Sequence, residues 1–169
     1  MAIAFDNATL VAAIDFARGR LLSSLAGIEK SGQDVSKVLA WRPGVGRAHI
    51  AWQAMHCAAT HDRYVNVRLR GATESDPDLV KHFGGGSTPA DTDIPSLETI
   101  RTKLEATFVV FKDFIKNTSD TEMARVMDFP NNVKRSVAES VVLLIWHESH
   151  HQGQMHLTWN LYKAAYGVA

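Results

Sequence analysis

Four of the eight histidines lie within ten residues, in the segment HESHHQGQMH at positions 147–156. His147 and His151 stand four residues apart in a strongly helical sequence, so they share one helix face, a single turn apart. That spacing suits two imidazoles that bind one cation, although two partly exposed surface histidines would look the same. His150 lies about 60° from His147 around the helix and is a candidate alternate or supporting ligand, whereas His156 points nearly the opposite way.

A third ligand must come from another segment, and residues 47–70 offer His49, His56 and His61. His49 and His56 are two turns apart and share a face, whereas His61 is rotated by about 140° from His56 and cannot easily join it. Small residues flank His56 in AMHCAAT and allow another helix to approach closely. We therefore favour His56, and we expect His49 to be a helix-end histidine near solvent.

The same segment contains a literal H-E-x-x-H motif, which in zinc proteases supplies two ligands and a general base. Such proteases take a third ligand from further along the chain, but no Asp or Glu follows Glu148. Gly153 and His156 each fall one residue short of the extended form of the motif. We interpret the protease match as accidental and expect Glu148 to face solvent.

Helical periodicity predicts an all-α protein with four long helices, and β-strand signals are weak. The helices are predicted at residues 7–29, 47–70, 96–118 and 136–166. Two Gly/Pro-containing segments, residues 31–46 and 71–95, are interpreted as connections. The second is long enough to cross a helix of about 35 Å, so the second and third helices can run parallel. We favour this four-helix bundle with a long crossover over an up-down-up-down bundle with short loops.

The length and composition of the chain exclude several classes of protein. A chain of 169 residues suits one domain, predicted over residues 1–169. Eighteen basic and eighteen acidic side chains give no net charge and no basic patch, which argues against a nucleic-acid partner. The N-terminus does not read as a secretory signal, and the longest apolar run, residues 141–146, is too short to cross a bilayer. The single cysteine, Cys57, excludes an intrachain disulfide framework, so we expect a cytoplasmic protein without a membrane partner.

Taken together, these segments resemble the DinB/YfiT-like superfamily of small bacterial four-helix proteins. HESHHQGQ at residues 147–154 fits the superfamily's H-x-x-x-H-x-G-Q motif in the last helix, and AWQAMHCAATHDRY at residues 51–64 resembles its second helix. WRPGVGR before the second helix and FGGGSTPADTDIPSLE in the crossover support the match. The resemblance spans nearly the whole chain, and the last-helix motif is its most specific part.

The resemblance implies an up-down-down-up bundle, frequently a homodimer, in which three histidines hold a divalent metal ion. Carried over to this sequence, the ligands are His56, His147 and His151. His61 matches a histidine of some relatives, but its different helix face leaves its role open. Three neutral imidazoles suit zinc, nickel, copper or iron and leave coordination positions open. We expect zinc or nickel.

Such a site can activate a water for hydrolysis, or a low-molecular-weight thiol as cosubstrate for transfer reactions on an unknown small molecule. The alternative is a metal-binding or stress-response bundle without turnover. Gln154, one turn beyond His151, could orient water or a ligand, or could equally serve the helix. Gly153 costs about 1 kcal/mol relative to alanine inside a helix, and close packing would explain that cost.

Further side chains have less specific interpretations. Arg47 and Arg63 could meet an anionic substrate, but each more readily serves surface pairing or a helix end. Six aromatic residues have helical spacing, which we interpret as core or dimer packing. They are Trp52, Phe108, Phe111, Phe114, Trp146 and Trp159.

Overall fold

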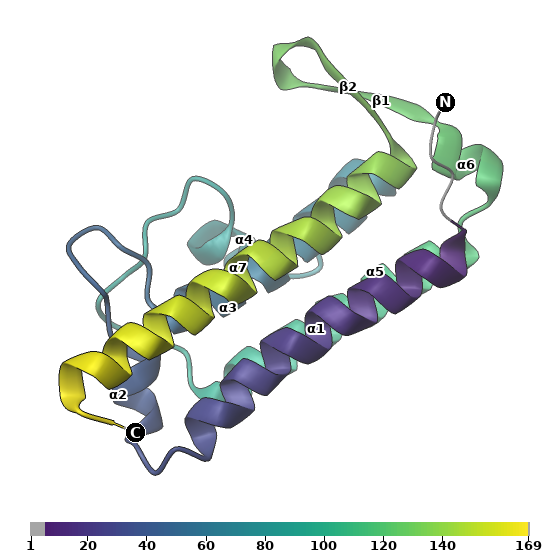
Figure 1. Ribbon diagram of the computed structural model, residues 1–169. Coiled ribbons are helices and arrows are strands. Elements are labelled where there is room, and N and C mark those ends of the chain that lie inside the picture. The colour runs from purple at the N-terminus through teal and green to yellow at the C-terminus, as the bar shows by residue number, and fades with distance from the viewer. Residues whose placement is uncertain (1–5, 169) are drawn as a thin grey trace.

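The computed structural model describes residues 6–168, and four long helices form its frame (Figure 1). They are α1 (Asn7–Glu29), α3 (Ile50–His61) with its continuation η1 (Asp62–Leu69), α5 (Leu97–Asn117) and α7 (Val137–Tyr166). The predicted all-α bundle is confirmed. The domain predicted over residues 1–169 includes residues 1–5 and 169, which lie outside the described range.

Contacts between helix ends fix the direction of α1 and α5. Asn7 Nδ2 donates to the carbonyl oxygen of Thr118 at 2.8 Å, and Arg101 pairs with Glu29 at 2.7 Å. The start of α1 therefore lies beside the end of α5, and the end of α1 beside the start of α5. These two helices run antiparallel.

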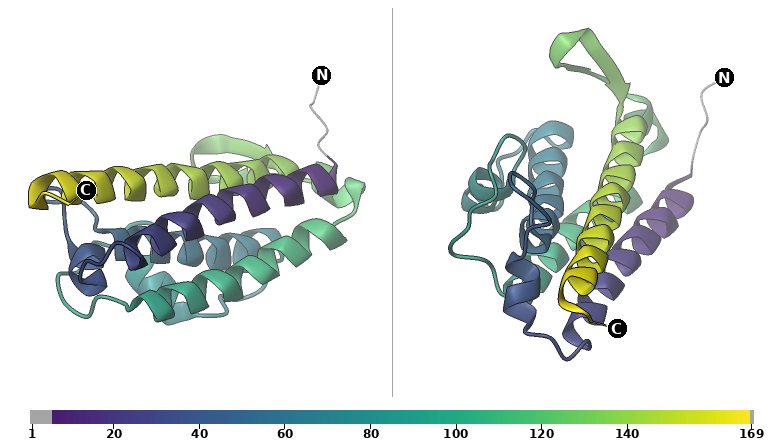
Figure 2. Two further views of the ribbon diagram at one scale, coloured as in Figure 1. Left: turned by 60° about the horizontal axis from the view of Figure 1, so that its bottom comes forward. Right: turned by 60° about the vertical axis from the view of Figure 1, so that its left-hand side comes forward.

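Contacts along α7 fix the other two directions. Arg18 of α1 pairs with Glu148 of α7, and Ser24, further along α1, is hydrogen-bonded to Gln152, further along α7. The contacts advance in the same direction on both helices, so α7 runs parallel to α1. It runs antiparallel to α3, because His151 contacts Gln53 while His147, which precedes it, contacts the later residue His56. The order is up-down-down-up, and Figure 2 shows α1 and α7 in one layer over α3 and α5.

Both predicted connections contain a short helix, which corrects their interpretation as loops. These are α2 (Val35–Ala40) and α4 (Pro77–Phe83). Each begins at an aspartate that accepts hydrogen bonds from the first-turn backbone, Asp34 for α2 and Asp76 for α4. Helices of six and seven residues are too short for apolar periodicity to stand out.

The connection before α7 also has structure that the sequence did not indicate. It contains α6 (Asp120–Ala124) and an antiparallel hairpin of β1 (Val126–Phe129) and β2 (Val133–Ser136) around the turn η2 (Pro130–Asn132). The hairpin projects from the end of the bundle in Figure 1. It leaves the fold class unchanged because, within residues 6–168, its two strands pair only with each other.

The helix predicted at residues 47–70 starts later and changes character midway. The side chain of His49 accepts a hydrogen bond from the backbone of Trp52 at 3.0 Å, so His49 caps α3, which begins at Ile50. From Asp62 onward the backbone widens into the π-helix η1. Such wide turns are rare and are frequently found at functional sites.

The buried apolar side chains form two clusters, one in each half of the bundle. The first includes Leu21, Leu25, Ala58, Leu104 and Met155, and the second includes Ile14, Ala17, Val65, Phe111 and Leu144. On all four long helices, buried polar residues lie between the two clusters. This polar layer consists of Arg18, His61, Asp62, Thr107, Glu148 and His151.

The aromatic side chains divide between the core and the surface. Phe108 and Phe111 are buried, as predicted, whereas Trp146 is 55% exposed. Leu157 and Leu161 are also exposed on α7, at 59% and 43%. Within residues 6–168, no helix has the length and apolar character that crossing a membrane would require.

Candidate metal centre

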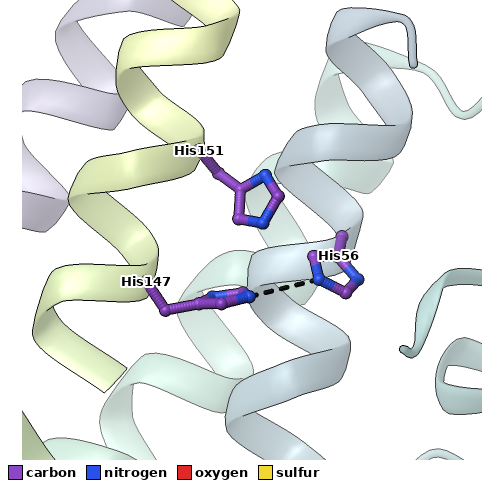
Figure 3. A group of neighbouring side chains, drawn as sticks. All are labelled: His56, His147 and His151. Atoms are coloured by element: carbon purple, nitrogen blue, oxygen red, sulfur yellow. Dashed lines mark hydrogen bonds between the residues drawn. The ribbon is translucent and has the colours of Figure 1, made fainter. Parts of the chain in front are cut away.

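Three histidines from two antiparallel helices meet at one point on the bundle. They are His56 of α3 and His147 and His151 of α7 (Figure 3). One ring nitrogen from each lies within 4.8 Å of the other two, and the Nε2 atoms of His56 and His147 are 3.2 Å apart. The i, i+4 spacing on α7 and the close approach of α3, where small residues flank His56, produce this arrangement.

Hydrogen bonds on the far side of two rings determine which nitrogen faces the cluster. His56 Nδ1 donates to the carbonyl oxygen of Phe83 at 2.6 Å, and His151 Nδ1 donates to Oε1 of Gln53 at 3.0 Å. Because Nδ1 carries the proton in both neutral rings, Nε2 keeps its lone pair. The indole of Trp52 also stacks on His56, with ring centroids 4.6 Å apart and planes 9° from parallel.

The contact between His56 and His147 is where a cation fits. Two nitrogens bound to one tetrahedral zinc ion would lie about 3.3–3.4 Å apart, given Zn–N bonds of about 2.0–2.1 Å. The observed 3.2 Å is close to this spacing. His56 Nε2 is an acceptor, so without a cation His147 Nε2 must supply the proton, while the buried Nδ1 of His147 has no partner among residues 6–168. A cation would replace that proton and use both lone pairs.

Burial keeps the three imidazoles neutral. Together with the neighbouring histidines, it lowers the pKa of His151 to about 3 and that of His147 to about 4, and burial is the larger cause in both. Burial also lowers the pKa of His56 against the opposing effect of its bond to Phe83. At neutral pH, protons therefore do not compete with a metal ion for these nitrogens.

Three residues are candidates to support the ligands, and the sequence indicated two of them, His150 and Gln154. His150 is exposed, with its ring stacked on Trp146 and its Nε2 2.8 Å from Gln154 Nε2, whereas Gln154 is half-buried and its hydrogen bond to His151 opposes the lowering of the His151 pKa. The third, Gln53, accepts from His151 Nδ1. Gln53 precedes His56 by three residues, so the two side chains share a helix face. One sign of this role was present in the sequence, a polar residue within the otherwise largely apolar segment AWQAMHCAAT.

Two further expectations near the site are wrong. His49 is only 1% exposed rather than near solvent, because its Nε2 donates to the carbonyl oxygen of Ala90 at 3.1 Å while Nδ1 caps α3. Gly153 is exposed, and a Cβ atom there would meet nothing within 4 Å, so close packing does not explain the glycine. His156 is exposed, in keeping with its predicted direction.

Glu148 does not face solvent, contrary to our expectation. Its side chain is fully buried and accepts from Arg18 Nε at 2.6 Å and from Arg18 Nη2 at 2.9 Å. His61 completes the group, with Nε2 3.3 Å from the Glu148 carboxylate. Burial and the Arg18 charge hold the pKa of His61 well below its usual range, so that ring is neutral. Glu148 is thus engaged in a buried ion pair, which removes the general base that a protease would need.

The crossover supports the site through Asp62. The carboxylate of Asp62 accepts from the backbone and hydroxyl of Ser75, from the backbone of Asp76 and from Asn66, at 2.6–2.9 Å. These bonds fix the start of α4, whose last residue, Phe83, presents its carbonyl to His56. The π-helix that begins at Asp62 therefore helps to orient a histidine on the preceding α-helix.

A pocket of about 310 Å³ opens beside the cluster. His56 and His147 form one wall, and the glycines that follow α4 form another. The complete lining is His56, Ala59, Thr60, Arg63, Tyr64, Arg68, Gly84, Gly85 and His147. A small molecule in this pocket would reach the histidines.

Comparisons with known proteins agree with this architecture. A family model described as the DinB superfamily matches residues 13–155. A crystal structure of a conserved protein from Enterococcus faecalis superposes with a TM-score of 0.72 at 15% sequence identity, covering 94% of this chain and 98% of that one. At that identity the likeness concerns the fold alone. No curated protein matches the sequence.

Proposed function

We propose that this protein, which belongs to the DinB superfamily, binds one divalent transition-metal ion through His56, His147 and His151. The observation that carries the proposal is the convergence of three neutral imidazoles, of which His56 and His151 are buried and His147 is half-buried. In two of them the outward nitrogen is already hydrogen-bonded, which orients the ring as metal-binding histidines usually are. Zinc or nickel suits an all-imidazole ligand set.

The ligand set favours chemistry over a purely structural role. A divalent ion held by three neutral ligands keeps its full charge and lowers the pKa of a water or thiol that binds in an open position. The chain supplies the rest: Phe83 and Gln53 orient two of the rings, and Trp52 covers one face of His56. The pocket beside His56 and His147 leaves room for a small molecule next to the ion.

Elemental analysis tests the proposal directly. Protein purified without added chelator is expected to contain close to one transition-metal ion per chain, because residues 6–168 contain one histidine cluster of this kind. Apoprotein reconstituted with zinc or nickel should reach the same ratio. A content near zero after reconstitution would contradict the proposal.

Two reaction classes are compatible with the site: hydrolysis, and transfer or isomerisation with a low-molecular-weight thiol as cosubstrate. The non-enzymatic alternative is a metal-binding or stress-response protein. We propose an enzyme because the pocket opens onto the histidines rather than closing them off.

Activity panels separate these possibilities. Metal-loaded protein is expected to turn over either ester and amide substrates or electrophiles offered with a thiol, and chelation should abolish the activity. Activity that survives complete metal removal would contradict both metal mechanisms. Metal-loaded protein without turnover in either panel would favour the non-enzymatic alternative.

Homodimerisation and a cytoplasmic location remain predictions. Trp146, Leu157 and Leu161 provide exposed apolar surface on α7 to which a second copy could bind. The single cysteine, Cys57, is unpaired and buried, which suits a reducing compartment.

A further inference from the structure

We infer that the pocket beside the three histidines binds the oxyanion group of a small molecule, a carboxylate or phosphate, through Arg63 and Arg68. The inference rests on the proposed function, because the two histidines of the pocket wall would present the metal ion to the other end of that molecule. It extends the proposed function by naming the chemical class of the ligand.

The π-helix brings the two arginines to the same pocket. Arg63 and Arg68 are five residues apart on η1, and in an α-helix this spacing would turn them about 140° away from each other. In a π-helix the hydrogen bond runs between residues i and i+5, so side chains five apart lie on one side of the helix, as side chains four apart do in an α-helix. Both arginines accordingly line the pocket.

The charges of these arginines are not neutralised within the described chain. Arg18, Arg42, Arg101 and Arg125 each pair with a carboxylate. Neither Arg63 nor Arg68 has a carboxylate within ion-pair distance in residues 6–168, and both side chains are exposed. Two guanidinium groups beside one small pocket favour a planar oxyanion, which accepts paired hydrogen bonds from arginine.

The rest of the lining fits an anion as well. It contains no acidic residue, and Thr60 and Tyr64 add two hydroxyl groups. Arg135 of β2 places Nη1 3.5 Å from the Tyr64 hydroxyl, which adds positive charge near that part of the pocket. The pocket therefore has a nitrogen-rich end at the histidines and a cationic side at η1, as a ligand with a metal-binding head and an anionic tail would require.

Matched ligands test the inference on the cobalt(II)-loaded chain, in which thiol coordination changes the visible absorption spectrum. The probes are 3-mercaptopropionate, 2-mercaptoethyl phosphate and the neutral 3-mercaptopropionamide, and cobalt content is measured first. At least one anionic thiol is expected to bind about tenfold more tightly than the amide, and raised salt should reduce the difference. Whether carboxylate or phosphate binds better identifies the group.

Variants assign the preference to the pocket. The R63M/R68M protein is expected to keep its cobalt but bind acid and amide about equally, whereas R63K/R68K, which retains the charge, should keep part of the preference. R47M is the matched control, because Arg47 is exposed and has no carboxylate partner within residues 6–168, but does not line the pocket. The preference should be unchanged in that protein.

The outcomes separate this inference from the proposed function. Failure to take up cobalt would contradict the metal site itself. Cobalt uptake without a thiol response, equal affinity for acid and amide in the unmodified chain, or a preference that persists in R63M/R68M would each overturn the anion pocket and leave the metal site standing.

Discussion

Replacing His147 and His151 with alanine is expected to reduce bound metal from about one ion per chain to near zero. The double substitution leaves His56 as the sole imidazole of the cluster, and one neutral ligand does not hold a divalent ion against buffer and water. The fold should persist, because four long helices and two apolar clusters surround the site. Elemental analysis after gel filtration gives the metal content, and circular dichroism gives the helix content.

His150 and His156 provide the matched control, because they lie on the same helix but are exposed. The H150A/H156A protein should keep its metal ion. A graded variant, Gln53→Leu, retains all three ligands but removes the acceptor of His151 Nδ1. Loss of such a supporting partner typically weakens metal binding by about 10- to 100-fold. Equal metal content in H147A/H151A and the unmodified chain would place the ion elsewhere.

Replacing Arg18 with methionine is expected to lower the free energy of unfolding by about 3–5 kcal/mol, the usual result of removing one member of a buried ion pair. Glu148 is fully buried, and both of its oxygens accept from the Arg18 guanidinium. Without Arg18, the Glu148 charge would keep the neutral ring of His61 but no cationic partner within residues 6–168. Urea denaturation of the metal-free proteins measures the change.

Two comparisons identify the cause. In the R18M/E148L double variant no carboxylate is left to bury, so most of the lost stability should return. Arg101 and Glu29 form a bidentate pair at the surface, where water screens the charges, so R101M should be far less destabilising than R18M. If R18M is no more destabilising than R101M, the prediction that loss of Arg18 leaves a costly unpaired charge on Glu148 is wrong.

The positions and directions of the long helices were predictable where the local sequence signals were strong. Apolar periodicity located α1, α5 and α7 to within about a residue at either end. The glycine- and proline-rich crossover correctly indicated that α3 and α5 run parallel. The cluster of three histidines could be predicted because the signals for it were local. These were the i, i+4 spacing on one helix and the small neighbours of His56 on another.

The surroundings of the site were not predictable because they depend on residues distant in sequence. Glu148 looked exposed because helical periodicity alone cannot indicate that Arg18, 130 positions earlier, lies opposite it. The acceptor for His56 is a backbone carbonyl, that of Phe83, which no side-chain pattern encodes. The π-helix also escaped detection, since a wider turn changes which residues share a face without changing their composition.

The position of the polar layer along the bundle also fixes the axial alignment of the helices relative to one another. Arg18, His61 and Glu148 meet at one height, with apolar side chains above and below. A shift of α7 by one turn, about 5.4 Å, would carry Glu148 away from Arg18 and into hydrocarbon, where an unpaired charge is strongly disfavoured. Two purely apolar faces would tolerate such slippage more readily. The buried charges therefore select a single axial alignment, the one that sets the imidazoles of α3 and α7 opposite each other.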